Sequence, residues 1–252
     1  MSAIFRLTFL EVISSMGWVV MLASTILLYF AIPAVSGAHG EGVVISRGQG
    51  ACAGVFLTGM YCIMLGGKLG AAQVGRGANL YYRSFGIGEL PRWLGVGGAA
   101  VFPLVASASL AGALLCWNYW SWTGNWAGGF VAVTQFSSLI VMMFFGVVLF
   151  TVGLGARFGY GPGVMAGVTL FVVGSFFPQL LSLVVANEPW LEGTWAFLPH
   201  LYALDWSPSV IYLWNPAGVG GYFAVFSYGI GWLLILGGVG LGAFSLSPNQ
   251  NE

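Results

Sequence analysis

The residues best suited to chemistry lie together in one polar interruption of an otherwise apolar chain. Residues 68–93 hold four of the seven basic side chains of the protein. The polar residues of this segment that could act together are Lys68, Gln73, Arg76, Arg83, Glu89 and Arg92. Such a segment can dock on a soluble protein, or its cations can hold it at anionic headgroups, each contributing about 1 kcal/mol. The residues alone leave both roles open.

The remaining ionisable residues form no set typical of an active site. The two histidines, His39 and His200, lie in polar segments outside the apolar stretches, so they cannot provide paired haem ligands inside a bundle. No Ser/His/Asp set and no pair of carboxylates share a plausible depth. The three cysteines fall in apolar stretches and show no metal-ligand spacing. We therefore predict no catalytic residues, no cofactor and no metal site.

Two further polar residues, His200 and Asp205, stand in the long segment 187–220. This segment is rich in Trp, Leu and Pro, and it is too long for a plain turn. We expect it to fold back on the membrane as short interfacial or re-entrant helices, with its Trp rings at the headgroup level. Because Ser207 and Pro208 follow Asp205, its carboxylate is predicted to cap a helix or turn there rather than to bind a substrate.

The composition indicates an integral membrane protein. Of the 252 residues, 58% are hydrophobic and 6% are charged, whereas soluble domains carry about 25% charged residues. The formal net charge of zero argues against nucleic acid as a partner, because nucleic-acid binding needs a concentrated basic surface.

The apolar stretches predict an all-α, polytopic protein with six transmembrane helices in a single domain. Each stretch has at least the roughly 17 residues that a helix needs to cross the hydrocarbon layer. Residues 1–15 are expected to form an amphipathic helix at the interface, with Phe5, Phe9, Val12 and Ile13 on its apolar face and Thr8 on its polar face. The predicted spans cover residues 16–32 (ending near Pro33), 50–67, 94–117, 130–154, 164–186 and 221–244.

The basic residues predict the orientation. With the N-terminus inside, six of the seven fall in cytoplasmic segments and only Arg47 falls outside. Lys and Arg in short loops are retained in the cytoplasm. We therefore predict a protein of the cell (inner) membrane with both termini and residues 68–93 on the cytoplasmic side.

Glycine pairs four residues apart predict close contacts between helices, because small residues let two backbones approach each other. Three such pairs stand in predicted spans: Gly50 with Gly54, Gly163 with Gly167, and Gly238 with Gly242. No phosphate-binding loop follows from the glycines, since Gly67 and Lys68 precede a leucine rather than Ser or Thr. Any ATP hydrolysis would therefore reside on another chain.

The order of these features resembles the permease subunits of type-2 ABC exporters. The family has an amphipathic N-terminal helix, six spans, and a loop after span two that begins as a continuation of the helix and ends in an acidic–Leu step. Residues 65–77 resemble the first half of that loop, and residues 80–90, which end in the Glu89-Leu90 step, resemble the second half. Residues 199–205 resemble the family's Pro-x-Leu-x-x-x-Asp segment. The family's acidic pair is replaced here by Ala71 or Ala72 and Gln73.

The resemblance implies an exporter permease that works with a separate ABC ATPase subunit. It also implies a second permease copy or homologue, a homo- or heterodimer interface that carries the substrate, and contact with membrane lipid. Residues 68–93 would transmit closure of the ATPase. The alternative interpretation is a non-catalytic structural subunit of a larger membrane complex, respiratory, photosynthetic or similar. An intramembrane enzyme or redox subunit fits least, for want of candidate residues.

Overall fold

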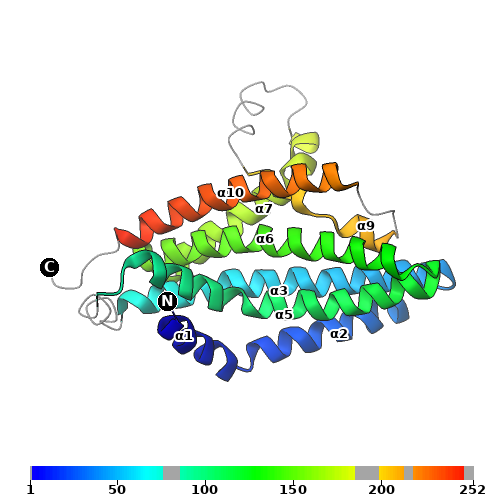
Figure 1. Cartoon of the computed structure of the whole chain (residues 1–252), viewed down its shortest axis with the longest axis horizontal. Coiled ribbons are helices and arrows are strands. Elements are labelled where there is room, and N and C mark those ends of the chain that lie inside the picture. Colours follow the sequence, from blue (N-terminus) through cyan, green and yellow to red (C-terminus); the bar gives the residue numbers. More distant parts are fainter. Residues whose placement is uncertain (1, 76–85, 185–198, 213–217, 247–252) are drawn as a thin grey trace.

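The protein is a bundle of long helices (Figure 1). The computed structural model describes residues 2–75, 86–184, 199–212 and 218–246. Within these residues the chain is all-α, with eight α-helices and one short 3-10 helix. The elements are α1 (Ser2–Ser14), α2 (Gly17–Ser36), α3 (Glu41–Gly75), α5 (Glu89–Thr123), α6 (Trp126–Phe158), α7 (Tyr160–Val184), η1 (Leu201–Leu204), α9 (Ser207–Ile211) and α10 (Val219–Ser245).

Five of these helices, α2, α3, α5, α6 and α10, are long and apolar enough to cross a membrane. The protein is therefore a multi-pass membrane protein. The fifth predicted span, residues 164–186, falls on α7, whose described apolar part, Tyr160–Phe176, is at the lower limit of the length that crosses a membrane. The described residues thus support five spans and leave the predicted sixth untested.

The helices extend beyond the predicted spans. α3 and α5 have 35 residues each, or about 52 Å at 1.5 Å per residue, against a hydrocarbon layer of about 30 Å. The first predicted span, α2, does not stop at Pro33 but continues to Ser36. The polar residue Arg47, which we expected between spans, lies inside α3. Hydropathy locates the apolar middle of each helix, whereas backbone hydrogen bonding extends the helix past it.

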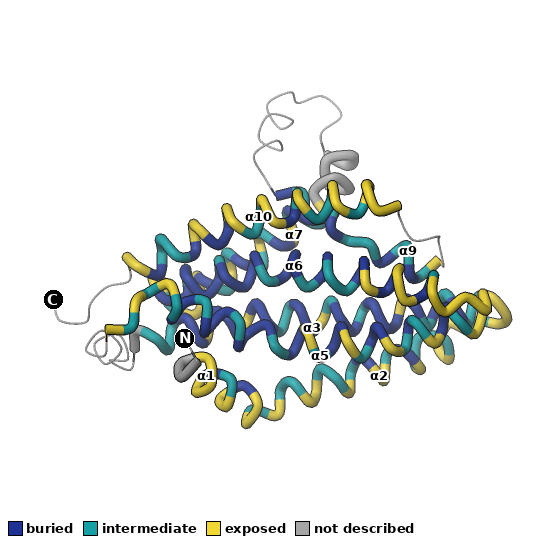
Figure 2. The backbone as a smooth tube through the Cα atoms, in the orientation of Figure 1, coloured by how far each residue is buried: buried dark blue, intermediate teal, exposed yellow. Residues whose placement is uncertain are grey.

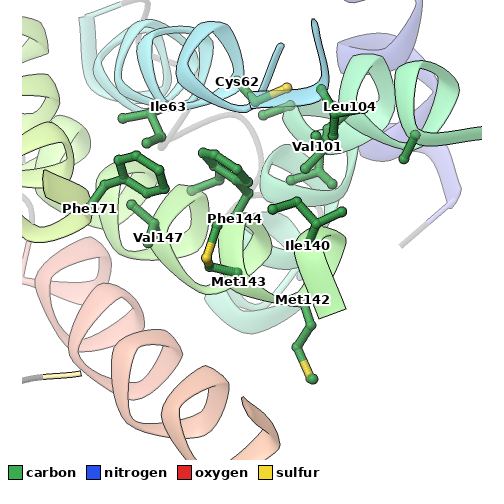
Figure 3. Packing of buried hydrophobic residues seen from close by; sticks show 14 of the residues in the cluster. Cys62, Ile63, Val101, Leu104, Ile140, Met142, Met143, Phe144, Val147 and Phe171 are labelled. Carbon is green, nitrogen blue, oxygen red and sulfur yellow. The ribbon is translucent and has the colours of Figure 1, made fainter. Parts of the chain in front are cut away.

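The core is built by α3, α5 and α6, which pack against one another, with α2 on α3 and α5, and with α7 and α10 on α6. In Figure 2 the three central helices are mostly buried, while α1, α2 and α10 show an exposed outer face. Figure 3 shows the centre of the packing, where Phe144 of α6 lies among side chains of α3, α5 and α7. The Phe144 and Phe171 rings stack there, with centroids 4.7 Å apart.

Two of the three predicted glycine contacts are present. A methyl group added at Gly54 would lie 2.6 Å from the Thr25 Cα atom of α2, and one at Gly163 would lie 2.6 Å from the Gly155 nitrogen of α6. The third prediction is wrong, because Gly238 and Gly242 have no described atom within 4 Å of an added methyl group. Another face of α10 makes the close contact instead.

A buried set of hydroxyl groups joins α2, α3 and α5. The Ser107 hydroxyl lies 2.9 Å from the Thr25 hydroxyl and accepts a hydrogen bond from Thr58 at 3.1 Å. All three side chains are fully buried. The Thr25 hydroxyl also donates to a carbonyl of its own helix, and Thr58 shares its one hydroxyl proton between Ser107 and a carbonyl of α3. These interhelical hydrogen bonds fix the level at which the three helices cross.

The N-terminal helix is present, but its packed face differs in part from the prediction. Phe9 meets Phe102 of α5 edge to face, with ring centroids 4.7 Å apart. Thr8 is buried although it was assigned to the polar face. The small Thr8 side chain, one turn before the buried Val12, allows α1 to lie close to the bundle.

The turn between α5 and α6 follows directly from two residues. Gly124 ends α5 with φ 68°, the left-handed conformation that glycine adopts without strain. Asn125 then caps α6 by accepting a hydrogen bond from the Gly128 amide at 2.9 Å. The Trp120 and Trp126 rings stack across this turn at 4.9 Å. Aromatic side chains at the end of a span are typical of a membrane–water interface.

Candidate functional site

One end of the bundle gathers the elements from which the sequence predicts a docking surface. α1, the end of α3, the start of α5 and the ends of α6 and α10 all lie at this end, on the left in Figure 1. The described basic residues of these elements are Arg6, Lys68, Arg92 and Arg157. Their gathering at one end agrees with the partition of charge that the sequence predicts.

The predicted docking residues have different environments. Lys68 is exposed on α3, which continues eight residues past Gly67 to Gly75. Gln73 lies in the last turns of the same helix, half-buried, and its Oε1 atom is buried. Glu89 is half-buried and begins α5, where its charge suits the positive end of the helix dipole. Arg76 and Arg83, with the short helix expected from residue 78 to 85, lie outside the described residues.

Arg92 corrects the sequence interpretation. We expected an exposed cation for a soluble partner, but the side chain is 1% exposed. The guanidinium carbon lies 4.6 Å from the centre of the Phe244 ring, in the last turn of α10. A cation is favoured there by the ring face and by the carbonyl groups that end the helix. Arg92 therefore joins α5 to α10 and takes no part in an exposed surface.

The next residue joins α5 to α6. The indole Nε1 atom of Trp93 donates a hydrogen bond of 3.1 Å to the Leu149 carbonyl. This bond is buried, because Trp93 is 4% and Leu149 is 3% exposed. The acceptor is a backbone atom in the last third of α6, so the bond sets where the start of α5 lies along α6.

Leu149 is also the point at which α10 crosses α6. A methyl group added at Gly240 would lie 2.6 Å from the same Leu149 carbonyl oxygen. One turn after Trp93, the Leu149 side chain packs where a side chain at Gly97 would stand. We call these six residues the α5–α6–α10 junction: Arg92, Trp93, Gly97, Leu149, Gly240 and Phe244.

The junction attaches the start of α5 to two neighbouring helices. Arg92 and Trp93 follow Glu89 by three and four residues, so the contacts to α10 and α6 lie about one helical turn after the first residue of α5. The sequence identified Arg92 but assigned it to the surface, and it gave no sign of Leu149 or Gly240. Pro91 next to Arg92 indicates that Arg92 lies inside a helix, but no local signal in the sequence distinguishes a buried position there from an exposed one.

The opposite end of the bundle carries the other predicted pair. Asp205 accepts a hydrogen bond from the Ser207 amide at 3.0 Å on Oδ1, so the predicted turn-capping role is confirmed. His200 is half-buried, and its amide donates to the Tyr228 hydroxyl at 2.9 Å. The two side chains line different cavities, so the structure does not bring them together in one site.

The described part of the segment 187–220 contains short helices, as the sequence predicts. η1 lies against α7, where a methyl group at Gly174 would come 2.7 Å from the Pro199 carbonyl. α9 lies against α3, where a methyl group at Gly48 would come 3.0 Å from the Ile211 Cα atom. The segment is therefore packed into the bundle by small residues of its neighbours.

No metal-binding group of three or more His, Cys, Asp or Glu side chains occurs among the described residues. Comparisons with protein families, with curated proteins and with solved structures find no match. The functional interpretation therefore depends on the arrangement of this chain's own residues.

Proposed function

We propose that this chain is the permease subunit of a type-2 ABC exporter, with six spans and both termini in the cytoplasm. One observation carries the proposal. The helix that follows the polar segment 76–88 is held to α6 and α10 by Arg92 and Trp93 within its first five residues. A partner that pushed on this segment would move the membrane helices and would not merely bend a loop.

The surrounding elements support the same interpretation. α3 continues as a helix toward the segment, and α1 packs on α5 at the same end of the bundle. An element that transmits force must be stiff and must be anchored where the force is to be delivered. A segment that only held the protein at anionic headgroups would need neither the continued helix nor the buried anchors.

In this proposal the chain does not hydrolyse ATP. The nucleotide site belongs to a separate ABC ATPase, which contacts residues 76–88 and the exposed Lys68. A second permease copy or homologue provides the facing half of the substrate path. The outer faces of α2 and α10, which are exposed and apolar, contact lipid or that second copy.

Co-purification tests the proposal. The full chain carrying a C-terminal affinity tag is purified from gently solubilised membranes of its source, and the proteins that accompany it are identified by mass spectrometry. We expect an ABC ATPase in stoichiometric amount. The double variant Arg76→Glu/Arg83→Glu is expected to lose the ATPase, whereas Arg157→Glu, an exposed charge at the end of α6, is expected to keep it.

Two results would contradict the proposal. The unmodified chain could purify without any ATPase, or it could accompany the components of a respiratory or photosynthetic complex. The second result would favour the structural-subunit alternative, in which the apolar faces of α2 and α10 pack against neighbouring membrane subunits.

A further inference from the structure

A cavity lies at the end of the bundle opposite to the junction. Its volume is about 390 Å³, within the range of small-molecule sites. It is bounded by α3, α7, η1 and the start of α9. The residues that line it are Phe56, Ser175, Phe176, Tyr202, Asp205 and Pro208.

The Asp205 carboxylate is the charged group of this cavity. Its Oδ1 atom accepts the Ser207 amide, which uses one of about four acceptor positions of a carboxylate. Among the described residues no cation pairs with it. Arg47 of the neighbouring α3 lies with its guanidinium carbon 5.8 Å from the centre of the Tyr29 ring of α2. Capping the turn therefore leaves most of this charge without a partner of opposite sign.

The sequence provides no cation elsewhere in this part of the chain. From residue 158 to residue 252 there is no Lys and no Arg, whereas Glu188, Glu192 and Asp205 fall within the segment 187–220. A half-buried carboxylate without a counter-charge attracts cations, and the surrounding low dielectric strengthens that attraction.

The other walls match an organic cation better than a bare metal ion. Phe56, Phe176 and Tyr202 are aromatic, and such rings attract alkyl and aryl ammonium groups through their faces. Phe176 is 50% and Tyr202 is 43% exposed, so both stand at the mouth of the cavity. The buried Ser175 hydroxyl, which also lines the cavity, has no hydrogen-bond partner among the described residues. A hard metal ion would need several oxygen ligands, and here one carboxylate and the hydroxyls of Ser175 and Tyr202 stand among mostly apolar walls.

We propose that this cavity binds a monovalent organic cation with an apolar body, paired with Asp205 and held between the aromatic rings. The cation can be a free lipophilic ammonium-type compound or the ammonium headgroup of a lipid, since both present the same chemistry. The proposed binding site does not depend on the presence of an ATPase. Only its interpretation as the site of an exported substrate rests on the proposed function.

Tetraphenylphosphonium is a suitable probe, because it is a lipophilic monovalent cation. Binding of the radiolabelled ion to the purified full chain is measured in a non-ionic detergent, with triphenylphosphine oxide, an uncharged compound with a similar aromatic body, as competitor. We expect saturable binding that unlabelled tetraphenylphosphonium displaces and triphenylphosphine oxide does not. Unlabelled phosphatidylethanolamine displaces the probe if the natural ligand is a lipid ammonium, whereas phosphatidylglycerol does not. A free compound as natural ligand leaves the probe undisturbed by both lipids.

Asp205→Asn is the decisive variant, because the amide oxygen can still accept the Ser207 amide and keep the turn. We expect its affinity for the probe to fall by at least about tenfold, with an unchanged thermal midpoint that shows the fold is intact. Glu41→Gln is the matched control, an acid of the same end that lines a different cavity, and it is expected to bind normally. Phe176→Leu removes a ring face and is expected to weaken binding about two- to fivefold.

Three results would overturn the inference: no saturable binding to the unmodified chain, undiminished affinity of Asp205→Asn, or displacement by triphenylphosphine oxide as strong as by unlabelled tetraphenylphosphonium. None of them depends on an ATPase. A failure here therefore leaves the co-purification test of the proposed function untouched, and loss of the ATPase leaves this binding measurement untouched.

Discussion

The crossing of α10 over α6 gives a sharp test of the packing. We consider replacing Gly240 by alanine. The added methyl group would lie 2.6 Å from the Leu149 carbonyl oxygen and 3.0 Å from the Phe150 Cα atom. Both atoms belong to the backbone, so no rotation of a side chain relieves the contact. An ordinary contact begins at about 3.4 Å, and α10 must therefore move by about 0.8 Å (3.4 minus 2.6).

That displacement sets the expected size of the effect. A gap of 0.5–1 Å costs about a quarter to a half of each dispersion contact across the interface. Forced insertion of a methyl group into a packed contact costs about 1–3 kcal/mol. Alanine also gains about 0.5–1 kcal/mol over glycine in any helix. Gly238→Ala and Gly242→Ala have the same gain in helix stability, but their added methyl groups meet no described atom within 4 Å, so they are the matched controls.

The native cysteines provide the assay. Cys52 and Cys62 are 3% and 0% exposed and should react with a thiol-reactive fluorophore only when the chain unfolds. Cys116 is partly exposed, so all variants carry Cys116→Ala. Thermal unfolding in detergent is followed by the fluorescence of the labelled thiols.

We expect Gly240→Ala to be less stable than Gly238→Ala and Gly242→Ala by about 1–3 kcal/mol, seen as a midpoint lower by several degrees. Equal midpoints for all three variants would refute the close crossing at Leu149. Loss of stability in Gly238→Ala or Gly242→Ala would place the packed face of α10 where the sequence first suggested it.

Three further predictions use the same protein. Trp93→Phe removes the buried hydrogen bond to α6 and is expected to cost about 1 kcal/mol in the thermal assay, whereas Trp117→Phe, at a 54% exposed position, should cost nothing measurable. Ser107→Ala removes two interhelical hydrogen bonds but leaves both threonines bonded within their own helices. It should therefore cost only about 1 kcal/mol, and a loss above about 3 kcal/mol would show that the hydroxyl set does more than fix the helix crossing. A cysteine placed at Ser121 should react with an impermeant thiol reagent added outside intact cells and one at Gly75 should not; the reverse pattern would invert the topology.

Much of the fold follows from local chemistry that can be recognised in the sequence. Long apolar stretches have one solution in lipid, a helix that satisfies its own backbone, so the membrane class and the approximate positions of the helices follow directly. The Asp205 cap also follows from its neighbours, because a carboxylate two residues before an amide reaches it without help from the rest of the chain. The Gly50 and Gly54 contact is of the same kind, since the pair stands on one face of one helix.

The tertiary structure alone decided which face of each helix is packed. In a membrane-spanning helix both the core face and the lipid face are apolar. The hydropathy of successive residues therefore shows no helical repeat that would distinguish one face from the other. This is why Gly238 and Gly242 were predicted to pack and Gly240 does so instead. The same limit applies to Arg92: its charge suggested a surface, but the ring of Phe244, 152 positions later in the chain, makes a buried position favourable. Contacts between residues so far apart depend on how the helices cross, and only the folded chain fixes that crossing.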